Sequence, residues 1–209
     1  MNIKLMQGDC LELMKEIPDG SVDLILTDPP YGTTACKWDT VIPLDLMWKE
    51  LNRIVKPNGA VVLFAQTPFD KVLGCSNLKN LRYEWIWIKD SGTGFLNSKK
   101  MPLKKHENIL VFYNKLPTYN PQFTNGKPYI AKSNIKEDVT VYGNIGIKDR
   151  IVTVSDGRRY PTTTDLNFHR KKDGGLHPTQ KPVALLEYLI KTYTNEGDTV
   201  LDNCMGSGS

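Results

Sequence analysis

The sequence predicts an α/β protein whose mostly parallel sheet is doubly wound, with helices covering both faces. Three observations lead to this prediction. Short apolar runs rich in branched side chains alternate with stretches of helical periodicity along most of the chain. Proline, glycine and aspartate mark the turns between the two kinds of segment. Strands that alternate with helices form a sheet of this type, and a single long segment interrupts the alternation.

The first three expected elements cover residues 3–7, 11–17 and 22–26. Apolar and polar side chains alternate weakly over residues 3–7, and a Gly-Asp pair follows. This pattern is typical of a short strand followed by a loop. Residues 11–17 carry apolar side chains at mixed helical spacing until a Pro-Asp-Gly turn. Residues 22–26 (VDLIL) are a short apolar run between turn residues, which favours a buried strand over a helix.

The next three elements are a helix, a strand and a second helix. Residues 43–55 carry large apolar side chains at steps of three and four, which predicts an amphipathic helix that ends before a Pro-Asn-Gly turn. Residues 60–65 (AVVLFA) are apolar throughout and predict a second buried strand. A short helix is expected over residues 68–75.

The remaining regular elements are three strands and one helix. Residues 83–88 and 107–113 are typical of strands, and the lysine-rich residues 90–106 between them predict a polar loop. Residues 182–193 are typical of a helix, and residues 199–201 begin a final strand. These elements complete the predicted alternation.

Residues 116–176 do not follow this pattern. They are rich in Asn, Thr, Tyr, Pro, Gly and basic side chains without a sustained period, which predicts an inserted lobe with little core of its own. The segment contains ten Lys or Arg and six Asp or Glu, so the net charge of +4 of the whole chain falls within it. A localised basic excess indicates a polyanionic partner, although a solvated surface has the same composition.

The composition is that of an ordinary globular protein, with 209 residues, 40% hydrophobic and 24% charged side chains. The four cysteines are Cys10, Cys36, Cys75 and Cys204. They form no C-x-x-C pair, which indicates a reducing compartment and argues against structural zinc. Neither a signal-peptide run nor an apolar stretch of roughly 18 residues is present. We therefore expect a cytoplasmic protein with no membrane contact and, because its histidines are scattered, no metal.

The strongest candidate for chemistry is Asp28-Pro29-Pro30-Tyr31, which follows the strand expected over residues 22–26. Ligands of open α/β sheets bind just outside such strand ends. A carboxylate and a backbone carbonyl that accept both hydrogens of an aromatic amine would direct its lone pair at an electrophile. The two prolines hold the Pro29 carbonyl in a fixed direction, and Tyr31 offers a flat face to an extruded base. A tight turn without chemistry is the alternative.

Three weaker motifs are candidates for ligand binding. The strand at residues 199–201 runs into Asp202 and a Gly-x-Gly turn, which lets a ligand approach the backbone. Residues 177–182 (HPTQKP) begin a helix whose positive end suits a carboxylate, or they are an ordinary cap. Asp9 could accept a hydrogen bond from a base amine or close a turn. The candidate binding residues are Asp9, Asp28, Thr179, Gln180, Lys181, Asp202, Gly206, Ser207 and Gly208.

Taken in this order, the motifs resemble those of the circularly permuted (beta-class) amino-methyltransferases of DNA, of the adenine-N6 type. In that family the Asp-Pro-Pro-Tyr motif comes early and the glycine loop of the cofactor comes late. The resemblance extends over residues 1–115 and 176–209, including residues 56–59 (KPNG) and 106–112 (HENILVF). It implies a Rossmann-like methyltransferase sheet, S-adenosylmethionine as the methyl donor, and double-stranded DNA as the substrate.

By the same resemblance, residues 1–115 and 176–209 form the catalytic domain, and residues 116–175 are the inserted target-recognition region. Two departures from the family are visible. Asn203-Cys204 replaces the usual Pro-Phe of the cofactor loop. The chain also stops at Ser209, before the helix, strand and acidic residue with which family members continue. We therefore expect a chain truncated at its C-terminus, which is a poor or inactive methyltransferase as it stands.

The hypothesis for the mechanism is that a flipped adenine stacks on Tyr31 while Asp28 and the Pro29 carbonyl accept its N6 hydrogens. Two lysine-rich clusters are expected to contact phosphates, with solvated loops as the alternative. These residues are Lys99, Lys100, Lys104, Lys105, Arg170, Lys171 and Lys172. A homodimer is a further open possibility.

Two other functions stay open. A cytosine-N4 DNA methyltransferase is the nearer one, and Asp28 argues against it because cytosine enzymes more often have serine there. RNA and protein amine methyltransferases place the glycine loop before this motif, so the order of the motifs argues against them. A catalytically inactive DNA-binding remnant is the alternative from another class, and binding of S-adenosylmethionine would distinguish it from an enzyme.

Overall fold

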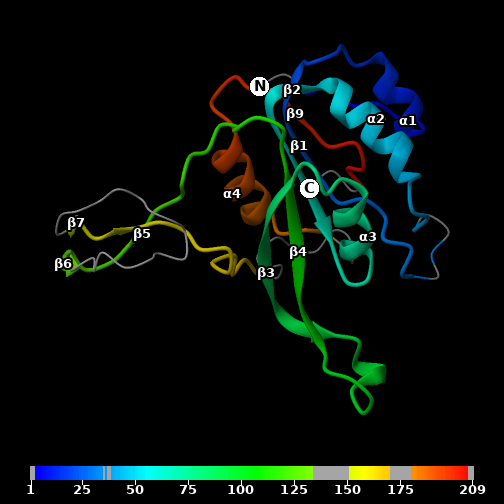
Figure 1. Ribbon diagram of the computed structural model, residues 1–209. Coiled ribbons are helices and arrows are strands. Elements are labelled where there is room, and N and C mark those ends of the chain that lie inside the picture. Colours follow the sequence, from blue (N-terminus) through cyan, green and yellow to red (C-terminus); the bar gives the residue numbers. More distant parts are fainter. Residues whose placement is uncertain (1–2, 35, 37–38, 134–150, 170–179, 207–209) are drawn as a thin grey trace. The chain divides into compact units, whose positions relative to one another are not determined.

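The computed structural model describes residues 3–34, 36, 39–133, 151–169 and 180–206 (Figure 1). The chain divides into two compact units, and the larger one consists of residues 1–120 together with residues 162–209. The smaller unit consists of residues 121–161. The larger unit contains the main sheet and every helix of the described residues.

A five-stranded sheet with the order β3-β4-β2-β1-β9 forms the centre of the larger unit. Its strands are β1 (Val22–Thr27), β2 (Val55–Ala65), β3 (Leu81–Thr93), β4 (Lys104–Phe112) and β9 (Val200–Leu201). Strand β1 is parallel to both β2 and β9, whereas β4 is antiparallel to β2 and to β3. Four strands therefore point the same way and β4 alone is reversed, which confirms the predicted mostly parallel sheet.

Helices cover both faces of this sheet, as predicted for a doubly wound fold. They are α1 (Cys10–Leu13), the 3₁₀ turn η1 (Met14–Glu16), α2 (Leu44–Ile54), α3 (Phe69–Ser76), the 3₁₀ turn η2 (Phe95–Asn97) and α4 (Val183–Tyr193). Figure 1 shows α4 on one side of the sheet and α2 and α3 on the other. Each of the four predicted helices is present, and the first is short and ends in η1.

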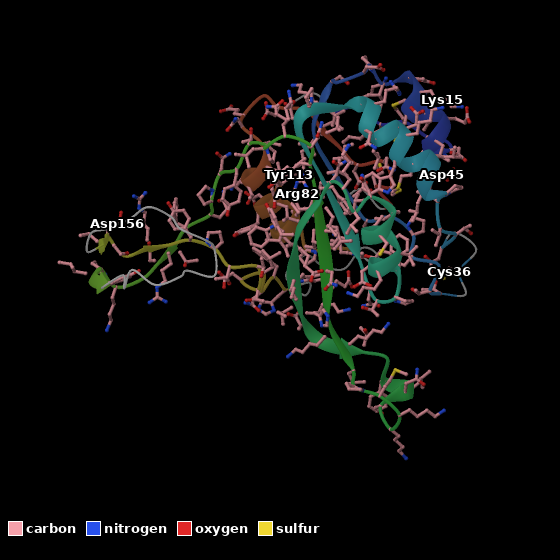
Figure 2. The ribbon with its side chains drawn as sticks, in the orientation of Figure 1. Lys15, Cys36, Asp45, Arg82, Tyr113 and Asp156 are labelled. Carbon is pink, nitrogen blue, oxygen red and sulfur yellow. The ribbon has the colours of Figure 1, made fainter. Side chains whose placement is uncertain are left out.

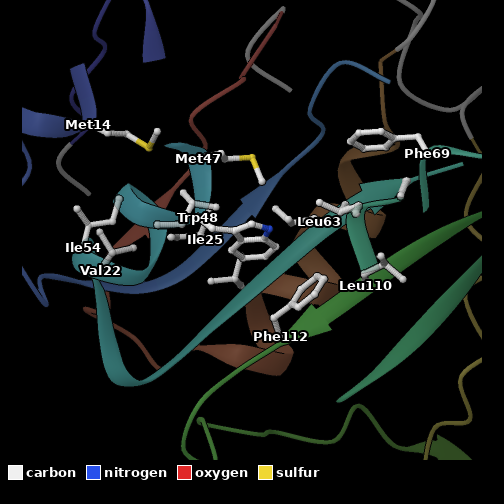
Figure 3. Packing of buried hydrophobic residues seen from close by; sticks show 14 residues of the cluster. Met14, Val22, Ile25, Met47, Trp48, Ile54, Leu63, Phe69, Leu110 and Phe112 are labelled. Carbon is white, nitrogen blue, oxygen red and sulfur yellow. The ribbon is translucent and has the colours of Figure 1, made fainter. Parts of the chain in front are cut away.

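The two faces of the sheet carry separate hydrophobic clusters because successive side chains of a strand point in opposite directions. In β2, Val61 and Leu63 face the cluster under α2 and α3, which Figure 3 shows with Trp48 and Phe112. Their neighbours in β2 face the cluster under α4, together with side chains of β3 and β4. Burial of these apolar side chains stabilises the sheet from both sides.

Hydrogen bonds between buried aromatic side chains link α4 to β3. The hydroxyl of Tyr193 accepts a hydrogen bond of 2.6 Å from Trp85 Nε1, and it shares another of 2.7 Å with the hydroxyl of Tyr83. Burial raises the pKa of Tyr83 to about 12. Because buried polar groups need partners, this triad fixes how α4 packs on the sheet.

The structure corrects one predicted strand and the boundaries of three others. Residues 3–7 form no strand in the described chain, and Ile3 and Leu5 are exposed. The neighbouring edge strand β9 has only two residues, so it offers little backbone to pair with. Strand β2 begins at Val55, directly after α2, because Val55 pairs with Val22. Strands β3 and β4 also continue into the predicted loop at residues 90–106, where each is the other's partner.

The smaller unit consists of two short antiparallel ladders in its described residues. Strand β5 (Thr124–Asn125) pairs with β8 (Arg158–Arg159), and β6 (Tyr129–Ser133) pairs with β7 (Ile151–Ser155). The Phe123 and Tyr160 rings contact each other at 4.8 Å between centroids. Most of the described apolar side chains of this unit are exposed.

We predict that Tyr193→Phe lowers the free energy of unfolding by about 1–3 kcal/mol, because it leaves the buried Trp85 Nε1 without its acceptor. Tyr188→Phe is the matched control, since Tyr188 lies on the same helix and its ring packs on Trp85. Urea denaturation of the three proteins measures the difference. Equal midpoints for Tyr193→Phe and the unchanged chain would contradict the structural role of the triad.

Candidate functional site

The candidate site lies where β1 and β9 end side by side. Because these strands are parallel, their carboxyl ends meet at the same edge of the sheet, where ligands of α/β folds bind. Thr27 is the last residue of β1, and its hydroxyl donates a hydrogen bond of 2.6 Å to Asp202, which follows β9. This contact joins the chain segments that lead to the two strongest sequence motifs.

A cleft of about 1430 Å³ opens at this edge. Its walls come from residues 28–31 after β1, residues 202–206 after β9, residues 5–8 near the N-terminus, and the approach to α4. Strands β3 and β4 contribute Trp87, Lys89 and Glu107. Small-molecule pockets usually measure roughly 300–1,000 Å³, so the cleft has room for a nucleoside-sized ligand and a second planar group.

The carboxylate of Asp28 is held at the edge of this cleft by two donors. Its Oδ1 accepts a hydrogen bond of 2.6 Å from the Tyr31 hydroxyl, and its Oδ2 forms an ion pair with Lys181 Nζ. The Asp28 side chain keeps 30% of its surface exposed. A carboxylate has about four acceptor positions, so Asp28 can still accept hydrogen bonds from a ligand in the cleft.

Lys181 belongs to a chain of alternating charges that runs from Asp28 to β3. Its Nζ lies 3.4 Å from Glu107 Oε2, and Glu107 Oε1 lies 3.2 Å from Lys89 Nζ. The side chains of Lys89, Lys181 and Glu107 expose only 8%, 10% and 13% of their surface. Buried charges need partners of opposite sign, and the two cations and two anions balance. We call these four side chains the charge network.

Tyr31 packs tightly beside the network. Its ring stacks on Phe69 with 5.4 Å between centroids, and Lys181 Nζ lies 5.8 Å from the ring centre. Burial, with the negative charge of Asp28, raises the pKa of the Tyr31 hydroxyl well above its usual value. The hydroxyl therefore stays protonated and acts as a donor to Asp28.

Asp202 organises the start of the predicted glycine loop. Its Oδ1 accepts hydrogen bonds from the Thr27 hydroxyl and, at 2.9 Å, from the Cys204 backbone N–H. The loss of water around the carboxylate raises the pKa of Asp202. Gly206 follows with a φ of +55°, a left-handed conformation that favours glycine, and it also lines the cleft.

The loop after Tyr31 is held by Asp39, a residue that the sequence did not single out. The Asp39 carboxylate accepts hydrogen bonds from the backbone N–H groups of Gly32, Thr33 and Thr34 at 2.9, 2.9 and 2.7 Å. Burial acts to raise the pKa of Asp39, but these donors outweigh it and lower the pKa. Asp39 thus shapes the wall of the cleft next to Asp28.

The structure brings together most of the predicted site residues that it describes. Asp28, Pro29, Pro30, Tyr31, Gln180, Lys181, Asp202 and Gly206 all line the cleft. Asp9 does not line it and instead caps α1, where its carboxylate accepts the Leu11 backbone N–H at 2.8 Å. Thr179, Ser207, Gly208, Arg170, Lys171 and Lys172 lie outside the described residues.

The four described lysines that were predicted to contact phosphates do not line the cleft. Lys99, Lys100, Lys104 and Lys105 are all exposed near the end of the β3–β4 hairpin. Lys104 Nζ donates a hydrogen bond of 3.0 Å to the Thr67 carbonyl. Among the described residues, no three acidic, histidine or cysteine side chains cluster as metal ligands. The described helices also include none that is long and apolar enough to span a membrane.

The mostly parallel sheet with one reversed strand, and the cleft at the carboxyl ends of its parallel strands, are those of a Rossmann-like α/β protein. The fold is that of solved DNA methyltransferases. M1.HpyAVI in complex with SAM has a TM-score of 0.59 and 23% identity, with 97% of this chain and 83% of that chain covered. The cytosine-N4-specific PvuII methyltransferase has a TM-score of 0.62 and 17% identity, with 93% and 71% covered.

Sequence comparison identifies the family. Residues 22–209 match the N6_N4_Mtase family, described as DNA methylase, and the chain belongs to this family. The chain is 29% identical to the type II methyltransferase M.HpaI of Haemophilus parainfluenzae. The alignment covers 100% of this chain and 65% of the relative. It is 28% identical to the DNA adenine methyltransferase YhdJ of Escherichia coli (strain K12), with 97% of this chain and 71% of the relative covered.

We predict that Asp39→Asn lowers the free energy of unfolding by about 1.5–3 kcal/mol at pH 7, because an amide replaces an ionised acceptor of three backbone donors. Because the pKa of Asp39 is lower in the folded state, its ionised carboxylate stabilises the fold at pH values above the ordinary pKa of 3.8. This contribution is lost as the pH falls through the lowered pKa. The difference between the two proteins should therefore shrink in strong acid.

Denaturation at a series of pH values measures this difference. Asp45→Asn is the matched control, because Asp45 is exposed on α2 (Figure 2). If Asp39→Asn and Asp45→Asn had the same small effect at pH 7, the hydrogen bonds of Asp39 would not stabilise the loop.

Proposed function

We propose that the protein is a site-specific DNA methyltransferase that transfers a methyl group from S-adenosylmethionine to N6 of a flipped adenine. The observation that carries this proposal is the position of Asp28. Its carboxylate lies at the edge of a cleft that the loop after β9 also lines, and it retains free acceptor positions. Membership of the DNA methylase family and the adenine specificity in the name of YhdJ support the same conclusion.

The residues of the cleft fit the cofactor. A sulfonium carries positive charge, and Asp202 supplies a carboxylate at the end of β9. Gly206 lets a ligand approach the backbone, because nothing but the Cys204 carbonyl lies within 4 Å of the position of a Cβ. When bound, the cofactor supplies an electrophilic methyl group. We propose Gln180, Asp202, Gly206, Thr179, Ser207 and Gly208 as its binding residues.

Asp28 and the Pro29 carbonyl act on the base in this proposal. The lone pair of an aromatic amine is delocalised into the ring, which makes the nitrogen a poor nucleophile. Two acceptors that bind its hydrogens draw the nitrogen toward tetrahedral geometry and free the lone pair. The rate is gained through positioning and preorganised dipoles.

The charge network gives Lys181 a different role from that suggested by the sequence. The sequence listed Lys181 among the candidate ligand-binding residues at a helix start that suits a carboxylate, whereas its Nζ is shared between Asp28 and Glu107. We propose that Lys181 orients Asp28, and that Glu107 and Lys89 hold Lys181. Tyr31 also orients Asp28, because its hydroxyl donates a hydrogen bond to Oδ1, the carboxylate oxygen that Lys181 does not contact.

We also propose the domain organisation of the circularly permuted class. The Asp-Pro-Pro-Tyr motif precedes the glycine loop in the chain, and residues 1–115 and 176–209 are the catalytic domain. Residues 116–175 are the target-recognition region, which agrees with a compact unit over residues 121–161. Arg170, Lys171 and Lys172 would contact phosphates of double-stranded DNA together with the hairpin lysines.

Cytosine-N4 methylation is the second candidate. It is supported by the fold similarity to the cytosine-N4-specific PvuII enzyme, and both reactions need acceptors for an exocyclic amine. Incubation of the chain with DNA and S-adenosylmethionine, followed by mass spectrometry of the nucleosides, distinguishes the two. We expect N6-methyladenine, in the low yield of a poor methyltransferase. N4-methylcytosine would support the second candidate, and DNA binding with no methylated nucleoside would support an inactive remnant.

We predict that Asp28→Ala abolishes methylation while affinity for S-adenosylmethionine changes only a few-fold, because the main partner of Asp28 is the base. Asp28→Asn should also lose most of the rate, since an amide is a weaker acceptor. Asp45→Ala, an exposed change on α2, is the control. If Asp28→Ala kept more than about a tenth of the activity, a loss of under roughly 1.4 kcal/mol, this role of Asp28 would be wrong.

We predict that Glu107→Gln lowers kcat by about tenfold, which corresponds to roughly 1.4 kcal/mol. Lys181 loses the second anion that holds it and no longer fixes Asp28. The KM for S-adenosylmethionine should stay the same, because Glu107 acts through Asp28 and not on the cofactor. Glu107→Asp should restore part of kcat. A rise in KM with unchanged kcat would place Glu107 at the cofactor instead.

A further inference from the structure

The β3–β4 hairpin extends beyond the part of the sheet that is covered by helices. Figure 1 shows its far end projecting away from the other strands, with η2 at the tip. Thr93 and Lys104 are the last paired residues before the tip. Residues 94–103 between them contribute to neither of the two hydrophobic clusters.

The tip is a folded structure with its own backbone hydrogen bonds. Gly94 has a φ of +89°, which a glycine adopts without strain, and its carbonyl accepts the Asn97 N–H at 2.9 Å. The Asn97 carbonyl then accepts the N–H groups of Lys100 and Met101 at 2.8 and 3.0 Å. These bonds order the backbone of the tip, so less backbone order has to be gained on binding.

Large apolar side chains are exposed at this tip. Leu96 exposes 97% of its surface and Phe95 exposes 77%. Met101 and Leu103, which lie between η2 and β4, expose 53% and 41% of their surface. Several large apolar side chains exposed within one short segment are a feature of interaction sites. Figure 2 shows the side chains of the hairpin end pointing outward on several sides.

The charge of the tip identifies the partner. Residues 91–105 contain four lysines and no acidic residue. Among the described residues, no carboxylate forms an ion pair with these four lysines. A second copy of the chain that docked tip to tip would bring two clusters of positive charge together, which costs free energy. A polyanion with apolar surfaces between its charges fits both features.

We propose that the tip of the β3–β4 hairpin is a wedge for double-stranded DNA. Lys99, Lys100, Lys104 and Lys105 bind phosphates, and Phe95 and Leu96 insert against the bases. Apolar wedges of this kind unstack base steps and bend the duplex. The inference rests on the proposed function, because a methyltransferase that flips its target must offset a few kcal/mol of lost stacking. The wedge contributes contacts that compensate for this loss.

The test compares three variants of the full chain in binding a fluorescein-labelled 30-base-pair duplex over a series of salt concentrations. The double variant Phe95→Ala/Leu96→Ala should bind at least roughly tenfold more weakly at every salt concentration, with an unchanged salt slope. Lys99→Gln/Lys100→Gln should flatten the slope by roughly two units. Val72→Ala/Leu78→Ala removes exposed apolar side chains elsewhere in the same unit and should bind like the unchanged chain.

Two results would overturn the wedge. One is DNA affinity of Phe95→Ala/Leu96→Ala equal to that of the Val72→Ala/Leu78→Ala control. The other is a dimer of the unchanged chain in sedimentation that the Phe95→Ala/Leu96→Ala variant loses, since the tip would then bind a second copy. Failure of the proposed function is separate, because it would appear as an absence of methylated nucleosides with the unchanged chain.

Discussion

The parallel pairing of β1 with both β2 and β9 is the constraint on which the site depends. Ile25 lies opposite Val61 on one side and Leu201 on the other, so three strands end at one edge. Thr27 and Asp202 are separated by 175 residues, and this pairing brings them into hydrogen-bonding contact. The buried apolar side chains of β1 hold the register, since a slip of one residue would turn each of them toward the opposite face.

Mutual ion pairing explains how four charged side chains are tolerated beside the core. Asp28 follows β1 and Lys181 precedes α4, while Lys89 on β3 forms an ion pair with Glu107 on β4, which lies opposite Trp87. Their charges cancel, so the cost of removing each from water is offset by its partners. A ligand that enters the cleft therefore meets a carboxylate whose orientation is already fixed.

The elements that the sequence predicted correctly are those with strong local signals. The apolar run before Asp28 and the amphipathic stretch of α2 needed no partner to be recognised. Asp39 and Lys89 were missed because their roles depend on groups brought close only by folding. The strand predicted over residues 3–7 was wrong for a related reason. A weak alternation of apolar and polar side chains does not show whether a partner strand is present. The polar ends of β3 and β4 lacked alternation and so resembled a loop.

A crystal structure of the chain with S-adenosylhomocysteine and a DNA duplex tests the central claim most directly. The account predicts that the sulfur lies in the cleft between the Asp28 and Asp202 segments. It also predicts that an extruded adenine donates an N6 hydrogen to Asp28, with Lys181 still paired to Asp28 and Glu107. A cofactor bound elsewhere on the sheet, or a base that contacts neither Asp28 nor the Pro29 carbonyl, would contradict the account.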